Sequence, residues 1–213
     1  MSEVLKPVKQ DYQLAQKAER INGEIEQTAT VATFGTSEGF QLLQRVASAL
    51  SKSTMVPKEY QDNLPNSIIA LNMANRIGAD PMMVMQNLYI VHGKPSWSSQ
   101  FLIAIFNACG RFSAIRYRMT GEKGTDSSGC IAWAVEKETG EVLEGTEITI
   151  GMAKKEGWAT KSGSKWQSFP EHMLKLRAAA WLVRVYAPEL AMGLHTREEI
   201  EDTSEDELSL IHI

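Results

Sequence analysis

The sequence is poor in cysteine and has no long apolar run. Its two cysteines, Cys109 and Cys130, lie far apart and lack metal-ligand spacing, so we expect buried free thiols rather than a disulfide. No stretch approaches the roughly 20 apolar residues that a membrane-spanning helix needs. The first residues also lack the apolar core of a secretory signal. The sequence therefore favours a cytoplasmic protein.

Recognisable catalytic motifs are absent as well. A phosphate-binding loop of the form Gly-x-x-x-x-Gly-Lys-Ser/Thr does not occur, which disfavours ATP-driven chemistry. Asp80, Asp126 and Glu136 fall in different expected elements, so they do not suggest a two-metal nuclease site. His92 has no second ligand at metal spacing. We expect a protein that is not an enzyme and that needs no cofactor or metal.

The acidic balance of the whole chain hides a basic middle. The formal net charge of −4, taken alone, argues against a nucleic-acid partner. By segment, the charge is −1 over residues 1–85, +4 over 86–186 and −7 over 187–213. Because the distribution of charge matters more than the total, the middle of the chain remains suited to a polyanion.

The length of 213 residues predicts one domain with tails. Residues 1–36 are polar and predict an N-terminal arm, partly helical over 11–27, where apolar residues recur at helical spacing. Residues 37–190 are expected to form the folded core. Residues 191–213 are acidic and predict a disordered tail, and we expect the natural chain to be longer than this.

Apolar periodicity predicts an α+β fold. Helical spacing and capping signals predict helices over 37–51, 64–78, 98–110, 150–157 and 170–187. A period of two predicts strands over 112–119, 130–135 and 142–150, joined as a three-stranded antiparallel β-meander. A short hairpin is expected near 88–97. The helices are expected to pack against the apolar face of the meander.

The stretch from Lys154 to Pro188 combines cations with aromatic rings. Lysines and tryptophans flank a flexible loop, and the helix after it carries Arg177, Trp181 and Arg184 in one stripe. Cations suit phosphates and rings suit bases or sugars, so this pattern is typical of nucleic-acid binding. Two other interpretations stay open, with Trp181 in the core and both arginines in salt bridges to glutamates of the sheet.

Further cations lie outside this stretch. Arg116 and Arg118 share one face of the expected strand over 112–119, although a solvated edge explains them equally well. Lys94 lies at the tip of the expected hairpin, where it could meet an anion. The candidate nucleic-acid-binding residues are Lys94, Arg116, Arg118, Lys154, Lys161, Lys165, Trp166, Lys175, Arg177 and Arg184.

Several separate motifs resemble the RecT/Redβ family of phage single-strand annealing recombinases. They lie in collinear order within about residues 38–200, and neither the arm nor the acidic tail carries a match. The matching segments are Asn72–Pro95, Ser96–Leu102, Cys109–Phe112, Ala132–Gly140, Gly163–Trp166 and Tyr186–Leu190.

This resemblance implies ATP-independent annealing of complementary DNA strands during phage homologous recombination. It implies self-assembly into rings or helical filaments, with single-stranded DNA and an annealed duplex intermediate in a basic groove. It also implies work in the bacterial cytoplasm beside a phage exonuclease and a host single-stranded DNA-binding protein. The fold it implies is an α+β core with a β-meander packed by helices.

Two other functions fit the same sequence features. A single-stranded DNA-binding protein that protects strands without pairing them would use the same cations and rings. A nuclease would need grouped carboxylates, which the sequence does not show. Strand-pairing kinetics separate the first from an annealing protein, and a magnesium-dependent cleavage assay tests the second.

Overall fold

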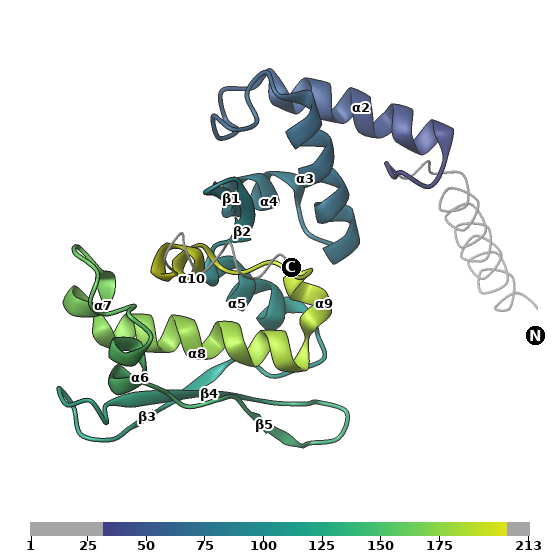
Figure 1. Cartoon of the computed structure of the whole chain (residues 1–213). Helices are drawn as coiled ribbons and strands as arrows, with labels where there is room; N and C mark the ends of the chain where they lie inside the picture. The colour runs from purple at the N-terminus through teal and green to yellow at the C-terminus, as the bar shows by residue number, and fades with distance from the viewer. Residues whose placement is uncertain (1–31, 204–213) are drawn as a thin grey trace, which may run out of the picture.

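The computed structural model describes residues 32–203 and has an α+β fold with small antiparallel sheets. The expected arm helix over 11–27 lies outside the described residues. Figure 1 shows helices α2 (Ser37–Ser51) and α3 (Leu64–Ile77) at one end of the molecule and the larger sheet at the other. The long helix α8 (Pro170–Tyr186) lies directly on this sheet. The expected α+β class is confirmed.

Local capping signals explain where the first helices begin and end. The side chain of Thr36 accepts a hydrogen bond from the backbone of the first turn, so Thr36 caps α2 in place of Ser37. Asn63 caps α3 in the same way. Gly78 ends α3 with a φ of 65°, a conformation that favours glycine. Both helices form where the sequence predicted them.

The expected hairpin forms from strands β1 (Leu88–Val91) and β2 (Lys94–Trp97), which pair antiparallel. His92 and Gly93 make its turn with φ of 49° and 75°, as a two-residue hairpin loop requires. The remaining helices are α4 (Pro81–Asn87), α5 (Ser99–Ala108), α6 (Ile150–Lys155), α7 (Lys165–Ser168), α9 (Pro188–Ala191) and α10 (Arg197–Asp202). Within residues 32–203, no helix is both long and apolar enough to cross a membrane.

The larger sheet is divided differently from the expected meander. Its four strands are β3 (Arg116–Thr120), β4 (Gly129–Val135), β5 (Val142–Glu144) and β6 (Ile148–Thr149). β5 and β6 pair with different parts of β4, so the single strand expected over 142–150 is interrupted. At the interruption, a Cβ on Gly145 would lie 3.3 Å from the Cβ of Leu182, which shows how closely α8 approaches the backbone there.

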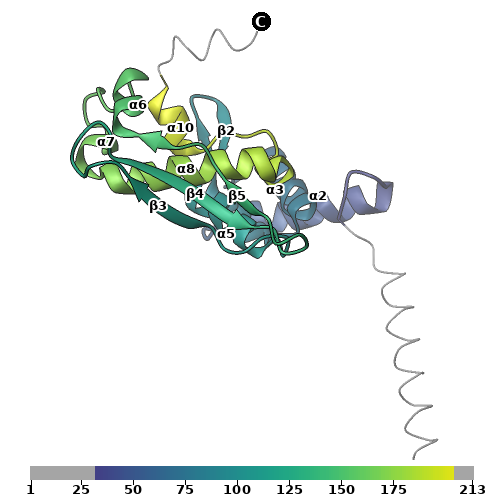
Figure 2. The same ribbon diagram turned by 90° about the horizontal axis from the view of Figure 1, so that it is seen from below.

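Small side chains bring α8 close to the sheet. Cys130, Ala132 and Ala134 of β4 are fully buried, and α8 contributes a run of buried alanines, Ala178–Ala180. Short side chains on both elements allow tight packing without voids. Viewed from below, β3, β4 and β5 lie in front of α8, so helix and sheet form two layers (Figure 2).

The acidic segment after residue 190 is not a disordered tail as far as the structure describes it. Residues 191–203 fold back, and α10 begins with a capping box between Thr196 and Glu199. Trp97 of β2 forms a parallel bridge with Thr196, and Ile200 is buried. The prediction of disorder is therefore wrong for 191–203. The acidic composition led to the wrong prediction, because Arg177 and Arg184 of α8 pair with Asp202 and Glu199 of this segment.

Candidate nucleic-acid interface

Arg177 is buried under α10 rather than exposed in a groove. Its side chain is 5% exposed and forms an ion pair with Asp202. The guanidinium carbon lies 3.9 Å from the ring centre of Trp158, a cation–π contact. Trp166 is also buried and donates a hydrogen bond from Nε1 to Oδ2 of Asp202 at 2.7 Å. Arg177 and Trp166 were both expected to contact DNA, and neither is accessible in this conformation.

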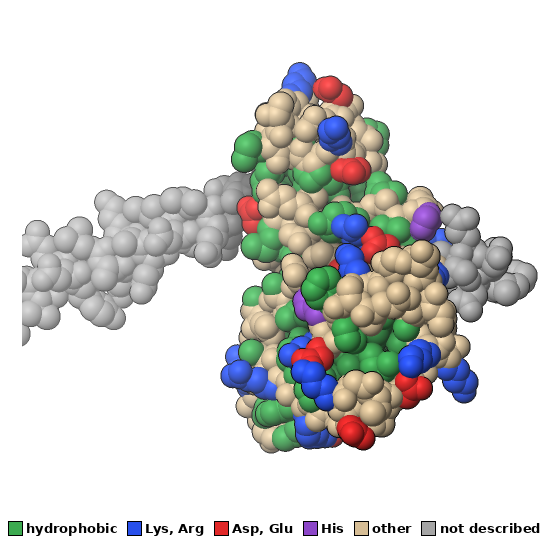
Figure 3. Space-filling view, turned by 90° about the vertical axis from the view of Figure 1, so that its left-hand side faces the viewer, with side chains coloured by type: hydrophobic (Ala, Val, Ile, Leu, Met, Phe, Trp, Pro, Cys, Tyr) green, Lys and Arg blue, Asp and Glu red, His purple; other side chains and the backbone are tan. Residues whose placement is uncertain are grey.

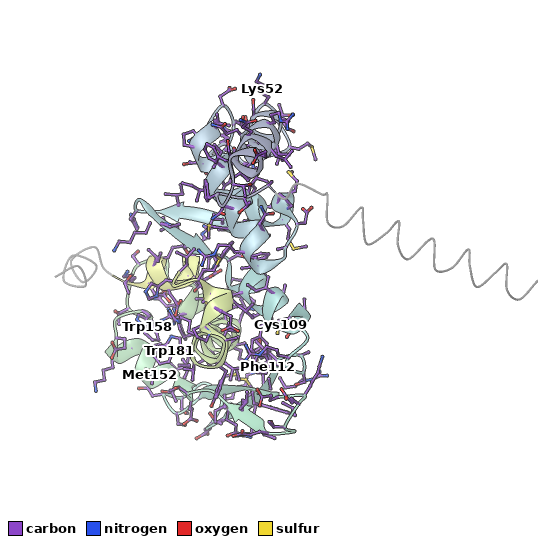
Figure 4. The ribbon with its side chains drawn as sticks, turned by 90° about the vertical axis from the view of Figure 1, so that its right-hand side faces the viewer. Lys52, Cys109, Phe112, Met152, Trp158 and Trp181 are labelled. Atoms are coloured by element: carbon purple, nitrogen blue, oxygen red, sulfur yellow. The ribbon has the colours of Figure 1, made fainter. Side chains whose placement is uncertain are left out.

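Arg184 makes a parallel set of contacts about two turns further along α8. It pairs with Glu199, and its Nη1 lies 2.8 Å from Nδ1 of His195. Trp181 donates from Nε1 to Oε1 of Glu199 at 3.1 Å. Figure 4 shows Trp158 and Trp181 side by side below α10, and their ring centres are 6.4 Å apart. The expected helical stripe exists, but its salt-bridge partners come from α10 rather than from the sheet.

Burial controls the ionisation of this network. Burial raises the pKa of the Asp202 carboxyl, against the hydrogen bond from Trp166 and the charge of Arg177. Burial also acts on Glu199, but the charges of Arg184 and Arg177 outweigh it and lower the pKa of that carboxyl. Burial lowers the pKa of the Arg177 guanidinium, although both carboxylates oppose this. The charged partners thus outweigh burial at Glu199 but not at Asp202 or Arg177.

Lys161 and Lys154 are occupied by other partners. The Nζ of Lys161 donates to the backbone carbonyls of Glu201 and Thr203, at 3.0 and 2.8 Å, and so caps the end of α10. Lys154 forms an exposed ion pair with Asp126 at 2.5 Å. A surface pair of this kind is weak and leaves Lys154 available to an anion, whereas Lys161 is tied to the fold.

Four candidates have no ion-pair partner within residues 32–203. Arg116 and Lys165 are exposed, while Lys94 and Lys175 are half-buried. They lie on different elements, namely β3, α7, β2 and α8. Over the face in Figure 3, Lys and Arg side chains are interspersed with Asp and Glu side chains. Because Arg177 and Trp166 are buried and Lys161 is bonded to the end of α10, the ten candidates cannot all line one accessible groove.

On the open face of the sheet, two arginines occupy positions next to a tryptophan of the neighbouring strand. Arg116 lies opposite Trp133 in the register of β3 and β4, and Arg118 lies opposite Ile131. Trp133 is in turn opposite Glu144 of β5. Directly paired residues share a face. This outer sheet face consists of Arg116, Arg118, Ile131, Trp133, Val135, Val142 and Glu144.

No element of residues 32–203 covers the outer sheet face in Figure 1, where α8 packs on the opposite side. Arg116 is exposed and Trp133 is half-buried. Arg118 donates two hydrogen bonds to Glu144, at 2.8 and 3.0 Å. This hydrogen bonding, together with the opposite charge, raises the pKa of Arg118 and lowers the pKa of Glu144.

Sequence reasoning missed Trp133 as a functional candidate. It grouped Ile131, Trp133 and Val135 on one face but did not relate that face to the arginines of the neighbouring strand. The alternating small residues Cys130 and Ala132 were the available signal, because a closely packed helix requires small side chains. That signal would have assigned Trp133 to the open face.

The comparisons with known proteins add no relative. No family model, curated protein or solved structure matches the chain. The resemblance to the RecT/Redβ family therefore stays a prediction.

The geometry also bears on chemistry other than binding. Among residues 32–203, no group of three His, Cys, Asp or Glu side chains is placed to hold a metal ion. Both cysteines are free, Cys130 buried and Cys109 partly exposed. Burial raises the pKa of Cys130 to about 11, so its thiol stays protonated at neutral pH. What the outer sheet face offers is binding of an anion beside a flat ring.

Proposed function

We propose that this chain binds single-stranded DNA on the outer sheet face and anneals complementary strands without ATP, acting as an oligomer in phage homologous recombination. The observation that supports this proposal is the arginine–tryptophan cluster of Arg116, Arg118 and Trp133 on an uncovered sheet. The resemblance to RecT/Redβ proteins supports the annealing step, and the cluster supports the binding step.

The cluster has the chemistry that a single strand requires. Arg116 and Arg118 are two residues apart on one strand, so their Cα atoms are separated by roughly 6.6 Å along the sheet. Guanidinium groups bind phosphate oxygens in a bidentate manner. Trp133, opposite Arg116 on the neighbouring strand, can stack on a base or sugar whatever the sequence. Contacts of this kind position a strand without reading its bases.

Annealing follows if the bound strand keeps its base edges free. A second strand can then test pairing, and a correct match is retained because each stacked step contributes about 1.4 kcal/mol. Protomers placed side by side would add their weak phosphate contacts along the strand. Neither step needs a nucleotide cofactor.

Removing the cluster should weaken DNA binding. We expect Arg116→Ala to reduce the salt dependence of oligothymidine binding by about 0.7 in log–log slope, because one phosphate contact is lost. Trp133→Ala should weaken binding by roughly 1–3 kcal/mol and leave the slope unchanged, because stacking is not ionic. Fluorescence anisotropy over a range of salt concentrations measures both effects.

The matched control for Arg116 is Lys137→Ala, because Lys137 is an exposed cation outside the cluster. Equal effects at positions 116 and 137 would show that general charge, and not this face, holds the DNA. Mixing dye-labelled complementary strands then tests annealing. Binding without any acceleration of pairing would identify a protective single-stranded DNA-binding protein instead.

Releasing Arg118 should strengthen binding. Glu144→Gln removes the carboxylate that occupies the Arg118 guanidinium, so we expect the salt slope to steepen by about 0.7. Glu141→Gln removes the same charge from an exposed position with no side-chain ion pair among the described residues, and it serves as the control. If both variants shift the slope equally, Arg118 does not contact the strand.

A further inference from the structure

The helix α10 covers a surface where two arginines and three tryptophans gather. We propose that the surface of α7 and α8 beneath α10 is a second binding site for a single-stranded DNA backbone, which α10 closes by placing carboxylates where phosphates would bind. This inference rests on the proposed function. It assigns a binding role to the cluster of Trp158, Trp166 and Arg177, which are buried, and Trp181 and Arg184, which are half-buried.

The donors beneath α10 are arranged as for two anionic groups. Asp202 receives a guanidinium from Arg177 and an indole N–H from Trp166. Glu199 receives a guanidinium from Arg184 and an indole N–H from Trp181. Charged and neutral N–H donors that converge on one oxygen group form the set that also binds phosphate. Each carboxylate thus occupies a position that suits an anion.

The aromatic rings supply the second component of such a site. Trp158 lies against Trp166, with ring centres 5.5 Å apart, and against the guanidinium of Arg177. Rings beside cations are the surface on which single-stranded bases stack. A structural ion pair alone does not require three tryptophans around it, whereas rings beside cations suit a site for bases and phosphates.

α10 is attached chiefly through polar contacts. It has six residues, and Ile200 is its only buried apolar side chain. A helix of this length is not stable alone, so the carboxylate contacts and the hydrogen bonds from Lys161 and Ser99 hold it in place. Buried ion pairs add little net stability over their separated partners in water. A polyanion that offers the same arginines phosphates can therefore compete with α10.

Solvent already reaches the edge of this contact. A hollow of about 150 Å³ lies between the α7 loop and α10, and it is lined by Lys161, Lys165, Glu201 and Asp202 among others. Lys165 is exposed there and has no ion-pair partner within residues 32–203. A phosphate entering the hollow would meet Lys165 first and Asp202 next, at the point where α10 must detach.

Hydrogen exchange of the wild-type chain tests the proposal directly. Peptides covering residues 195–203 should exchange faster when oligothymidine is bound at saturation, because α10 leaves its site. Unchanged or slower exchange in these peptides, with DNA bound, would overturn the inference and leave the proposed function standing. Absence of any binding of oligothymidine would instead overturn the proposed function.

A pair of variants gives a second measurement. We expect E199Q/D202N to bind oligothymidine about three- to tenfold more tightly, with a salt slope steeper by about 1.4 as two guanidinium groups become available. E138Q/E141Q removes the same charge from exposed positions that have no ion pair among the described residues, and it leaves α10 and both of its pairs intact. Equal gains in the two variants would overturn the inference, because charge removal alone would explain them. If E199Q/D202N does not fold, the exchange measurement on the wild-type chain decides.

Discussion

Replacing Arg177 by alanine is expected to lower the free energy of unfolding by about 3–5 kcal/mol, because it leaves a buried carboxylate without its partner. Arg177 is 5% exposed, and Asp202 is its ion-pair partner. The substitution also removes the cation–π contact with Trp158. For a domain of this size, such a loss lowers the melting temperature by roughly 6–20 °C. Urea unfolding followed by tryptophan fluorescence measures the change.

Two comparisons make this result specific. Arg118→Ala removes an exposed ion pair with Glu144, and we expect no measurable change in the midpoint of unfolding. The double variant Arg177→Met with Asp202→Leu should recover much of the loss, because neither charge is then buried alone. If Arg177→Ala were as mild as Arg118→Ala, the buried network beneath α10 would not exist in solution.

The sequence could predict the helix that carries Arg177, but it could not predict which residues pair with Arg177. The helices over 37–51, 64–77 and 170–186 could be predicted because caps, prolines and a 3.6-residue period are local signals. The stripe of Arg177, Trp181 and Arg184 followed from the same period. The partner of this stripe, α10, could not be predicted, because the chain folds back to bring α10 there and no local pattern encodes that fold-back.

The acidic tail illustrates the same limit. High charge and few apolar residues predict disorder when a segment has nothing to neutralise it. Here Glu199 and Asp202 meet Arg184 and Arg177, which precede them by 15 and 25 residues. The register of the sheet was also not predictable, so Trp133 could not be placed beside Arg116. Both are contacts between segments that a local sequence pattern does not encode. These contacts decide which cations are accessible.

Introducing a Cβ at Gly121 is expected to be among the most damaging single changes to the sheet. Gly121 follows β3 and has a φ of 65°. A Cβ there would lie 1.8 Å from the backbone oxygen of Ser127, so the loop between β3 and β4 could not close as it does. We expect Gly121→Ala to lower the free energy of unfolding by about 3 kcal/mol, from steric overlap added to left-handed strain. Urea unfolding measures it.

The control is Gly124→Ala in the same loop. Gly124 has a φ of 87°, and no atom lies within 4 Å of a Cβ built on it. We therefore expect Gly124→Ala to lower the free energy of unfolding by only about 1–2 kcal/mol, which is the strain of a left-handed alanine. The backbone of this loop also accepts hydrogen bonds from Ile150 and Gly151 at the start of α6. Displacing it should weaken oligothymidine binding through β3, and equal destabilisation by the two variants would show that the loop closes differently from the structure.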